Sequence, residues 1–231
     1  GGDGNDVLMG GAGRDALSGG NGDDVLFGNE GNDIVSGGLG DDVIEGGTGN
    51  DLLLGGDGSD TYVYGRGDGS DDIVETAGAT GDKDILVLHD IARNEAVLHK
   101  FGDNVEIEFG NGEKISLRNQ LAGGGVELVT FADGTLLNRD AIVKGLVNRG
   151  PVAAADTLAA VDEDAASFLI SFATLLANDK DADLDQLAVT GVSLVAGGTA
   201  VLEENGIRFT TAADFNGTAS FSYRITDGRG G

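Results

Sequence analysis

Gly1-Gly-Asp-Gly-Asn-Asp-Val-Leu-Met9 is the first of seven consecutive nonapeptides of the form Gly-Gly-x-Gly-x-Asp-x-apolar-x, which continue without a gap to Val63. Slots one and four are glycine in every copy, and slot two departs only at Asn29. One such unit is too small to bury a core alone, so the repeat predicts a solenoid of stacked copies. The eighth slot always holds a large apolar residue: Leu8, Leu17, Leu26, Val35, Ile44, Leu53 and Tyr62.

Glycine adopts positive φ values that other residues resist. We therefore expect the first six residues of each copy to form a turn whose carbonyl oxygens point inward. The last three residues are rich in Val, Leu and Ile and predict a very short strand. Asn29 suits its glycine slot because Asn tolerates the left-handed region. Slots three and five vary freely, which indicates that only their backbone matters.

The sixth slot is an aspartate in all seven copies, and stacking would place these carboxylates in columns. Layers roughly 4.8 Å apart bring like charges close enough to repel by about 0.8 kcal/mol even in water. Burial of one apolar residue in nine cannot offset both this repulsion and the conformational entropy that a glycine-rich chain loses on folding. Calcium, which takes carboxylate and carbonyl oxygens in flexible geometry, fits the need. A flexible Gly/Asp-rich linker is the alternative, but it does not explain the fixed apolar slot.

The nonapeptides resemble the calcium-binding repeats of the RTX (repeats-in-toxin) family of secreted bacterial proteins. The resemblance implies a parallel β-roll with two nonapeptides per coil and about five calcium ions between stacked turns. Repeats 1, 3, 5 and 7 would then stack on one side and repeats 2, 4 and 6 on the other. Asp68, Asp71 and Asp72, where the repeat decays, are candidates to complete a final site, and Asp72 is a further candidate ligand among them. The implied ligands are Asp6, Asp15, Asp24, Asp33, Asp42, Asp51 and Asp60, with the backbone carbonyls of Gly2, Gly4, Gly11, Gly13, Gly20, Gly22, Gly31, Gly38, Gly40, Gly47, Gly49, Gly56 and Gly58.

The chain carries a formal net charge of −26, which argues against nucleic acid and against anionic membranes as partners. Cysteine is absent, so neither disulfides nor thiolate metal sites form. Extracellular calcium modules bind with dissociation constants on the order of 0.1–1 mM, so these repeats would fill only outside the cell. The RTX resemblance implies an extracellular or cell-surface location and export by a type I-like route. No signal peptide or membrane span is evident.

In residues 76–150 glycine becomes less frequent and alternating apolar residues appear, which predicts a β-rich region that caps the β-roll. Phe131-Ala-Asp-Gly134 resembles the segment that follows the repeats in haemolysin-type proteins. A short capped helix is expected over 138–145. Apolar alternation between turn signals predicts strands over 84–89, 96–101, 105–109, 113–117 and 126–131.

Pro151, the only proline, marks an expected boundary, so the predicted domains are 1–75, 76–150 and 151–231. The last segment resembles the cadherin-like repeats of bacterial surface proteins, through Leu175-Leu-Ala-Asn-Asp179 and Phe221-Ser-Tyr-Arg-Ile-Thr-Asp-Gly228. That family adds one further strand after the final Asp-Gly, absent here. An Ig-like β-sandwich is expected, with strands over 167–171, 187–192, 199–202, 206–210 and 219–225.

Asp179, Asp181, Asp183 and Asp185 alternate along one loop of this segment. Either the loop is simply solvated, or Asp179, Asp181 and Asp183 help to hold another calcium ion. An EF-hand is excluded because, counted from Asp181, the sixth position is Gln186 and the twelfth is Val192.

The sequence contains no His-Glu-x-x-His zinc helix, no Gly-x-Ser-x-Gly elbow and no phosphate loop, so we expect no catalysis within the chain. The predicted fold is all-β: a parallel β-roll, a β-rich cap and a β-sandwich. The predicted function is a calcium-folded structural segment of a large secreted or surface-attached adhesin-like protein. Other surface proteins or glycans could be partners of such a parent. The alternative is the secretion and folding module of an RTX toxin or hydrolase.

Overall fold

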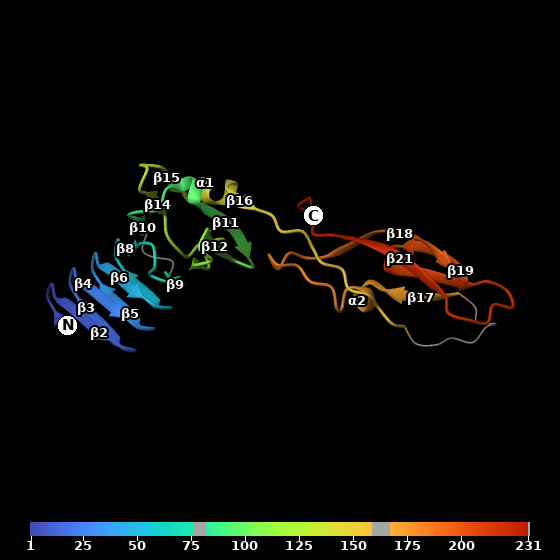
Figure 1. The fold of residues 1–231 in the computed structure, drawn as a ribbon, viewed down its shortest axis with the longest axis horizontal. Coiled ribbons are helices and arrows are strands. Elements are labelled where there is room, and N and C mark those ends of the chain that lie inside the picture. The colour runs from blue at the N-terminus through green and yellow to red at the C-terminus, as the bar shows by residue number, and fades with distance from the viewer. Residues whose placement is uncertain (76–81, 159–166, 231) are drawn as a thin grey trace. The chain divides into compact units, whose positions relative to one another are not determined.

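The computed structural model describes residues 1–75, 82–158 and 167–230. The chain forms two compact units, Gly1–Val147 and Asn148–Gly231 (Figure 1). The predicted all-β class is confirmed, since the described elements are β-strands apart from three short helices. The boundary falls at Val147/Asn148, three residues before the position expected from Pro151.

The repeats of the first unit form two parallel sheets. Each strand pairs with the strand one full coil away, so Val7 lies opposite Val25 and Ala16 opposite Ile34. This spacing confirms two nonapeptides per coil, with odd and even copies on opposite sides (Figure 1). One sheet contains β1 (Gly2–Asp3), β3 (Ala16–Asn21), β5 (Ile34–Leu39), β7 (Leu52–Asp57) and β9 (Asp71–Val74); the other contains β2 (Val7–Ala12), β4 (Val25–Glu30), β6 (Val43–Thr48) and β8 (Thr61–Tyr64). We call β1–β9, residues 1–75, the roll.

The repeat unit differs from the predicted six-residue turn and three-residue strand. Strands last six residues and include the first two glycines of the next copy, which leaves a turn of only three residues. Gly20 in slot two has a φ of 121° and Asn29 in the same slot a φ of 76°. Slot-one glycines do not adopt positive φ. They are needed for space instead, because a Cβ on Gly19 would overlap the carboxylate of Asp24.

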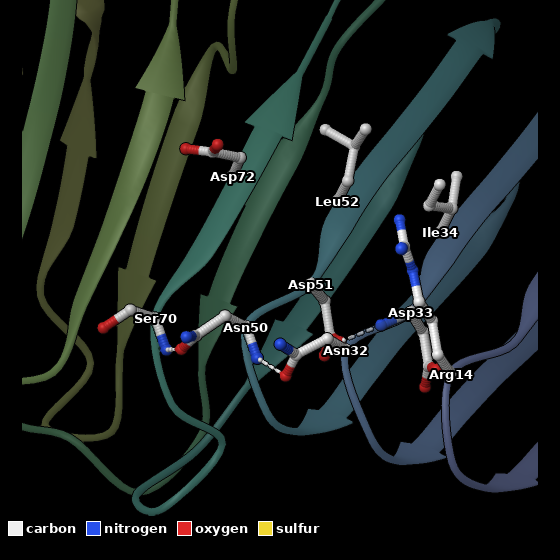
Figure 2. Close-up of a pocket in the computed structure, with 9 residues that line it drawn as sticks. All are labelled: Arg14, Asn32, Asp33, Ile34, Asn50, Asp51, Leu52, Ser70 and Asp72. Atoms are coloured by element: carbon white, nitrogen blue, oxygen red, sulfur yellow. Dashed lines mark hydrogen bonds between the residues drawn. The ribbon is translucent and has the colours of Figure 1, made fainter.

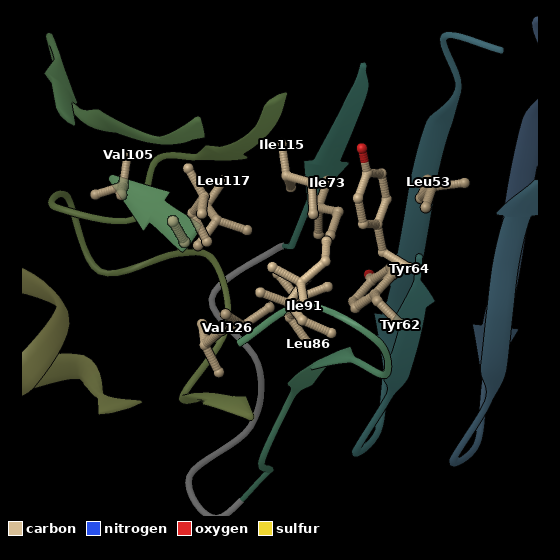
Figure 3. Close-up of a cluster of buried hydrophobic side chains, with 14 of the residues drawn as sticks. Leu53, Tyr62, Tyr64, Ile73, Leu86, Ile91, Val105, Ile115, Leu117 and Val126 are labelled. Atoms are coloured by element: carbon tan, nitrogen blue, oxygen red, sulfur yellow. The ribbon is translucent and has the colours of Figure 1, made fainter. Parts of the chain in front are cut away.

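The core of the roll is the stack of eighth-slot side chains predicted from the repeat. Leu26, Val35 and Ile44 are fully buried. The stack continues without a break through Tyr62 and Ile73 into the side chains that follow the repeats (Figure 3). One hydrophobic core therefore serves the whole first unit.

Residues 82–147 extend the roll rather than forming a separate domain beside it. β10 (Ile85–Leu88) pairs in parallel with β8, and β13 (Lys114–Arg118) pairs in parallel with β9. The predicted helix is α1 (Arg139–Lys144), capped by the Asn138 side chain, which accepts from Ala141 N–H at 2.9 Å. The remaining elements are β14 (Leu128–Phe131) and β15 (Leu136–Asn138) beyond β10, the 3-10 helix η1 (Arg93–Glu95), and β12 (Asn104–Phe109), β11 (Ala96–Phe101) and β16 (Leu146–Val147) beyond β13.

The second unit has two antiparallel sheets that share one core. Ile170, Ile207 and Phe209 of one sheet pack in the same cluster as Val189 of the other. In the described residues, no helix is both long and apolar enough to cross a membrane. The first sheet contains β17 (Phe168–Ser171), β20 (Gly206–Thr211) and β19 (Gly198–Glu203), the second β18 (Ala188–Ala196) and β21 (Ser220–Thr226), and α2 (Phe172–Leu175) follows β17.

Candidate metal centre

The sixth-slot aspartates form two columns, one along each row of turns. In each column the backbone N–H of one aspartate donates to Oδ1 of the aspartate one coil further on. Asp24 N–H donates to Asp42 at 2.7 Å. Asp33 N–H donates to Asp51 at 2.7 Å, as Figure 2 shows. The same bond joins Asp6 to Asp24, Asp42 to Asp60 and Asp15 to Asp33, at 2.7–2.8 Å. Each column therefore uses one carboxylate oxygen to hold the turns in register.

The second oxygen of each carboxylate is left without a partner. Among the described residues, nothing donates a hydrogen bond to the buried Oδ2 of Asp15, Asp24, Asp33, Asp42, Asp51 or Asp60. A buried acceptor without a donor costs free energy, and a charged one costs more. Such a row of oxygens is what a divalent cation requires, so the residues fit calcium.

Glycine carbonyls of one coil lie close to glycines of the next. A Cβ on Gly38 would overlap the carbonyl oxygen of Gly20, and one on Gly40 would overlap that of Gly22. The role of these carbonyls as ligands stays a prediction. The carbonyl oxygens that lie next to a glycine of the following coil belong to Gly2, Gly4, Gly13, Gly20, Gly22, Gly31, Gly38, Gly40 and Gly49. The other predicted glycines of slots two and four are Gly11, Gly47, Gly56 and Gly58.

Both columns of carboxylates continue beyond the repeats. Asp51 N–H donates to Asp71 at 2.9 Å, and Asp60 N–H donates to Asp84 at 3.0 Å. The predicted ligand Asp72 lies outside the column and forms a two-hydrogen-bond pair with Arg118, at 2.7 and 3.0 Å. The step from Asp51 to Asp71 is 20 residues instead of 18, so counting slots could not select Asp71.

Burial raises the pKa of the carboxyl groups near the end of the roll. The pKa of Asp51 rises to about 6, that of Asp60 to about 7 and that of Asp71 to about 8. Desolvation is the main cause in each case, and the neighbouring carboxylates of the column raise the pKa further. These sites favour either a proton or a metal ion over a bare charge.

Fifth-slot side chains form a second, outer row that the sequence did not predict. Asn50 N–H donates to Asn32 Oδ1 at 3.0 Å, and Ser70 N–H donates to Asn50 Oδ1 at 2.9 Å (Figure 2). On the other row of turns, Asp41 N–H donates to Asp23 Oδ1 at 3.0 Å. Slot five therefore favours a side chain with an acceptor oxygen, and Arg14 is the exception.

The three candidate calcium ligands of the second unit, Asp179, Asp181 and Asp183, are largely engaged in hydrogen bonds. Asp183, fully buried, accepts from Arg149 N–H at 2.7 Å and Arg149 Nε at 2.6 Å. Asp179 accepts from Ala154 N–H at 2.7 Å and from the Tyr223 hydroxyl at 3.2 Å. Asp181 Oδ1 accepts from two backbone N–H groups, while its buried Oδ2 accepts from no described residue.

Comparison with known families agrees with this geometry. The family model of the RTX calcium-binding nonapeptide repeat matches residues 1–35 and 36–74. Residues 1–74 are RTX calcium-binding repeats. The model of a cadherin-like domain matches residues 147–231, which covers the second unit. RTX repeats and cadherin-like domains are typical of secreted or surface proteins.

Ten chains of solved structures match this chain. One of them is the solution structure of the R3 subunit of a mannuronan C5-epimerase from Azotobacter vinelandii. It is 23% identical, the match covers 57% of this chain and 80% of that one, and the TM-score is 0.27, so it carries no argument here. No curated protein matches the chain.

Proposed function

We propose that calcium ions bind between the stacked turns of the RTX roll and that their binding folds it. The observation that carries this proposal is the row of buried carboxylate oxygens without donors, six of them in two columns. Each gap between successive carboxylates of a column would take one ion. This gives the five gaps expected from the seven repeats and two beyond them, one between Asp51 and Asp71 and one between Asp60 and Asp84.

The buried carboxylates need either a proton or a cation to neutralise their charge. Asp24, Asp33 and Asp42 are each 1% exposed. Burying an isolated ionised carboxylate is so unfavourable that the group normally takes up a proton or a counter-ion. Ions bound only by the folded roll add their binding free energy to its stability.

The test compares the full chain with and without calcium by circular dichroism and by isothermal titration. Calcium should induce most of the β signal of the roll, and the Asp24→Asn/Asp42→Asn variant should bind fewer ions more weakly. Asparagine retains the Oδ1 acceptor for the neighbouring N–H, so the change removes mainly charge. Asp57→Asn/Asp103→Asn, two exposed positions with the same charge change, is the matched control. A metal-free chain with full β content, or equal binding by the two variants, would contradict the proposal.

We further propose that the RTX chain is a structural segment of a large secreted or surface-attached adhesin-like protein. The cadherin-like domain that follows the RTX repeats in the sequence supports this role, because such domains are typical of secreted or surface proteins. Sequencing the gene on both sides separates this role from that of a secretion module. Further cadherin-like copies would support the adhesin, and a hydrolase or toxin domain upstream would contradict it.

A further inference from the structure

Three carboxylates converge where the roll meets the strands that follow it. Asp60 ends the turn before β8, Glu75 follows β9 and Asp84 precedes β10. One carboxylate oxygen from each lies within 4.8 Å of the other two. The exposed fractions of the three residues are 0%, 2% and 5%, so the cluster is buried.

Two oxygens of this cluster have no partner among the described residues. Asp60 Oδ1 accepts from Asp42 N–H at 2.8 Å, which leaves its buried Oδ2 free. Glu75 Oε1 accepts from the Tyr62 hydroxyl, which leaves its buried Oε2 free. Asp84 Oδ1 accepts from Asp60 N–H. The hydrogen bonds orient all three side chains, and each side chain still offers an oxygen atom to a ligand.

Glu75 replaces a glycine of the repeat pattern. The pairing of β9 with β7 sets Leu54 opposite Val74, so Glu75 follows beside the slot-one Gly55. A Cβ on Gly55 would overlap oxygens of both Asp60 and Glu75, so both carboxylates lie over this glycine. The gaps between repeats offer two sixth-slot carboxylates, whereas this gap offers three.

The negative charge of the cluster is not balanced by the protein itself. In the part of the chain that the structure describes, no Lys or Arg donates to these three carboxylates or pairs with them. The next carboxylate of the column, Glu127, does have a cation: Arg139 donates to its Oε1 at 2.6 and 3.0 Å. The column of carboxylates therefore ends in a guanidinium one step beyond a cluster that has no cation of its own.

We propose that Asp60, Glu75 and Asp84 form a terminal divalent-cation site that takes calcium before the gaps between the repeats do. The inference rests on the proposed calcium function of the roll and adds Glu75 as a third carboxylate at the gap between Asp60 and Asp84, beyond the last complete repeat. Affinity for calcium rises with the number of charged ligands and with the rigidity of the site. This site has Glu75 as an extra carboxylate and lies next to the hydrophobic core of the first unit. The first ion would therefore link the last coil of the roll to β10.

The test uses the full chain and two readouts. In isothermal titration, Glu75→Gln should weaken the tightest calcium by about tenfold or more, since even outer-shell changes at metal sites have effects of this size. Glu30→Gln, an exposed position with the same charge change, should not alter it. Asp24→Asn/Asp42→Asn should lose weaker ions and retain the tightest one.

Terbium supplies the second readout, because a nearby tyrosine sensitises its luminescence. The first equivalent of Tb³⁺ should be sensitised in the wild-type chain and in Tyr64→Phe but not in Tyr62→Phe, since the Tyr62 hydroxyl touches Glu75. This readout does not depend on whether Glu75→Gln folds. A first ion that is unaffected by both Glu75→Gln and Tyr62→Phe would overturn the terminal site while leaving the inter-turn ions intact. No calcium binding by any variant would instead overturn the proposed function.

Discussion

Slot-one glycine is conserved within the repeat for space rather than for its backbone angles. A Cβ on Gly37 would overlap the free carboxylate oxygen of Asp42 and lie 2.8 Å from the carbonyl oxygen of Gly55. Both oxygens belong to the proposed calcium ligands or their immediate surroundings. The glycine therefore keeps a channel open for the ion.

Gly37→Ala should accordingly raise the calcium concentration needed to fold the roll and cost about 1–3 kcal/mol, the usual penalty of overpacking. Gly191→Ala is the matched control, since Gly191 also lacks positive φ and has open space where the Cβ would go. It should change stability by less than about 0.5 kcal/mol. Calcium titration followed by circular dichroism measures both; equal midpoints would contradict the spatial explanation.

The sequence predicted the columns of slot-six aspartates but not their surroundings. Identical spacing implies identical positions in successive coils, so the aspartates at slot six could be placed together. Asp71 was named only as one of three candidates where the repeat decays, and Glu75 and Asp84 were missed. All three lie after the last complete repeat, where the spacing changes and only strand pairing defines the neighbour. The fifth-slot row was missed because Asn, Asp and Ser look unrelated until their shared acceptor oxygen is seen.

At the scale of elements, α1 closes one end of the carboxylate column. Arg139 at its start donates to Glu127, to the Gly124 carbonyl at 2.7 Å and to the Gly125 carbonyl at 2.6 Å. One partly buried guanidinium thus satisfies a carboxylate and the loop before β14. The helix buries only Ile142 in the core, so its main contribution to the first unit comes from Arg139.

Arg139→Met should therefore destabilise the first unit by about 1–3 kcal/mol, the range for hydrogen bonds to charged groups. Lys144→Met in the same helix removes the same charge at an exposed position and should cost far less. Urea denaturation at saturating calcium gives both values. If the two variants unfold together, the guanidinium does not close the column.

The second unit depends on a buried ion pair close to its first residue. Asp183 is fully buried and its carboxylate is held by Arg149. Removing one partner of a buried pair leaves an uncompensated charge, which costs about 3–5 kcal/mol. Exposed pairs such as Arg208–Glu203 contribute only about 0–1 kcal/mol.

Arg149→Ala should accordingly lower the unfolding free energy of the cadherin-like unit by several kcal/mol, whereas Arg208→Ala should have little effect. Chemical denaturation followed through Tyr223, the only tyrosine of this unit, measures the difference. Adding Asp183→Asn to Arg149→Ala should recover part of the loss. Equal effects of the two arginine substitutions would refute the assignment.

At the scale of the molecule, the sequence predicted the class and most strands but not how the middle segment joins the roll. Alternating apolar residues mark strands locally, and the observed strand bounds lie within a few residues of those expected. Which strand pairs with which is a non-local property. The sequence therefore suggested three domains where β10 and β13 continue the two sheets of the roll into one unit.

The carboxyl groups at the end of the roll also predict opposite effects of pH with and without calcium. Burial raises the pKa of Asp60 to about 7 and those of Asp71 and Glu75 to about 8. In the metal-free fold these groups hold protons that the unfolded chain releases near pH 4. Folding then takes up protons, so the stability of the metal-free unit should fall as the pH rises from about 4 to about 8.

Calcium reverses the sign, because an ion binds the deprotonated carboxylates and competes with the protons. The calcium-saturated unit should therefore lose stability as the pH falls through the same range. Circular dichroism of the metal-stripped chain and urea denaturation of the calcium-saturated chain, each at pH 5 and pH 8, test this. Acid should increase the residual β signal of the metal-stripped chain and lower the unfolding free energy of the calcium-saturated chain. If a fall in pH shifts folding in the same direction in both samples, protons and calcium do not share these carboxylates. Protons that stabilise the metal-free fold must displace calcium from the same oxygens, so the two samples should respond to acid in opposite directions.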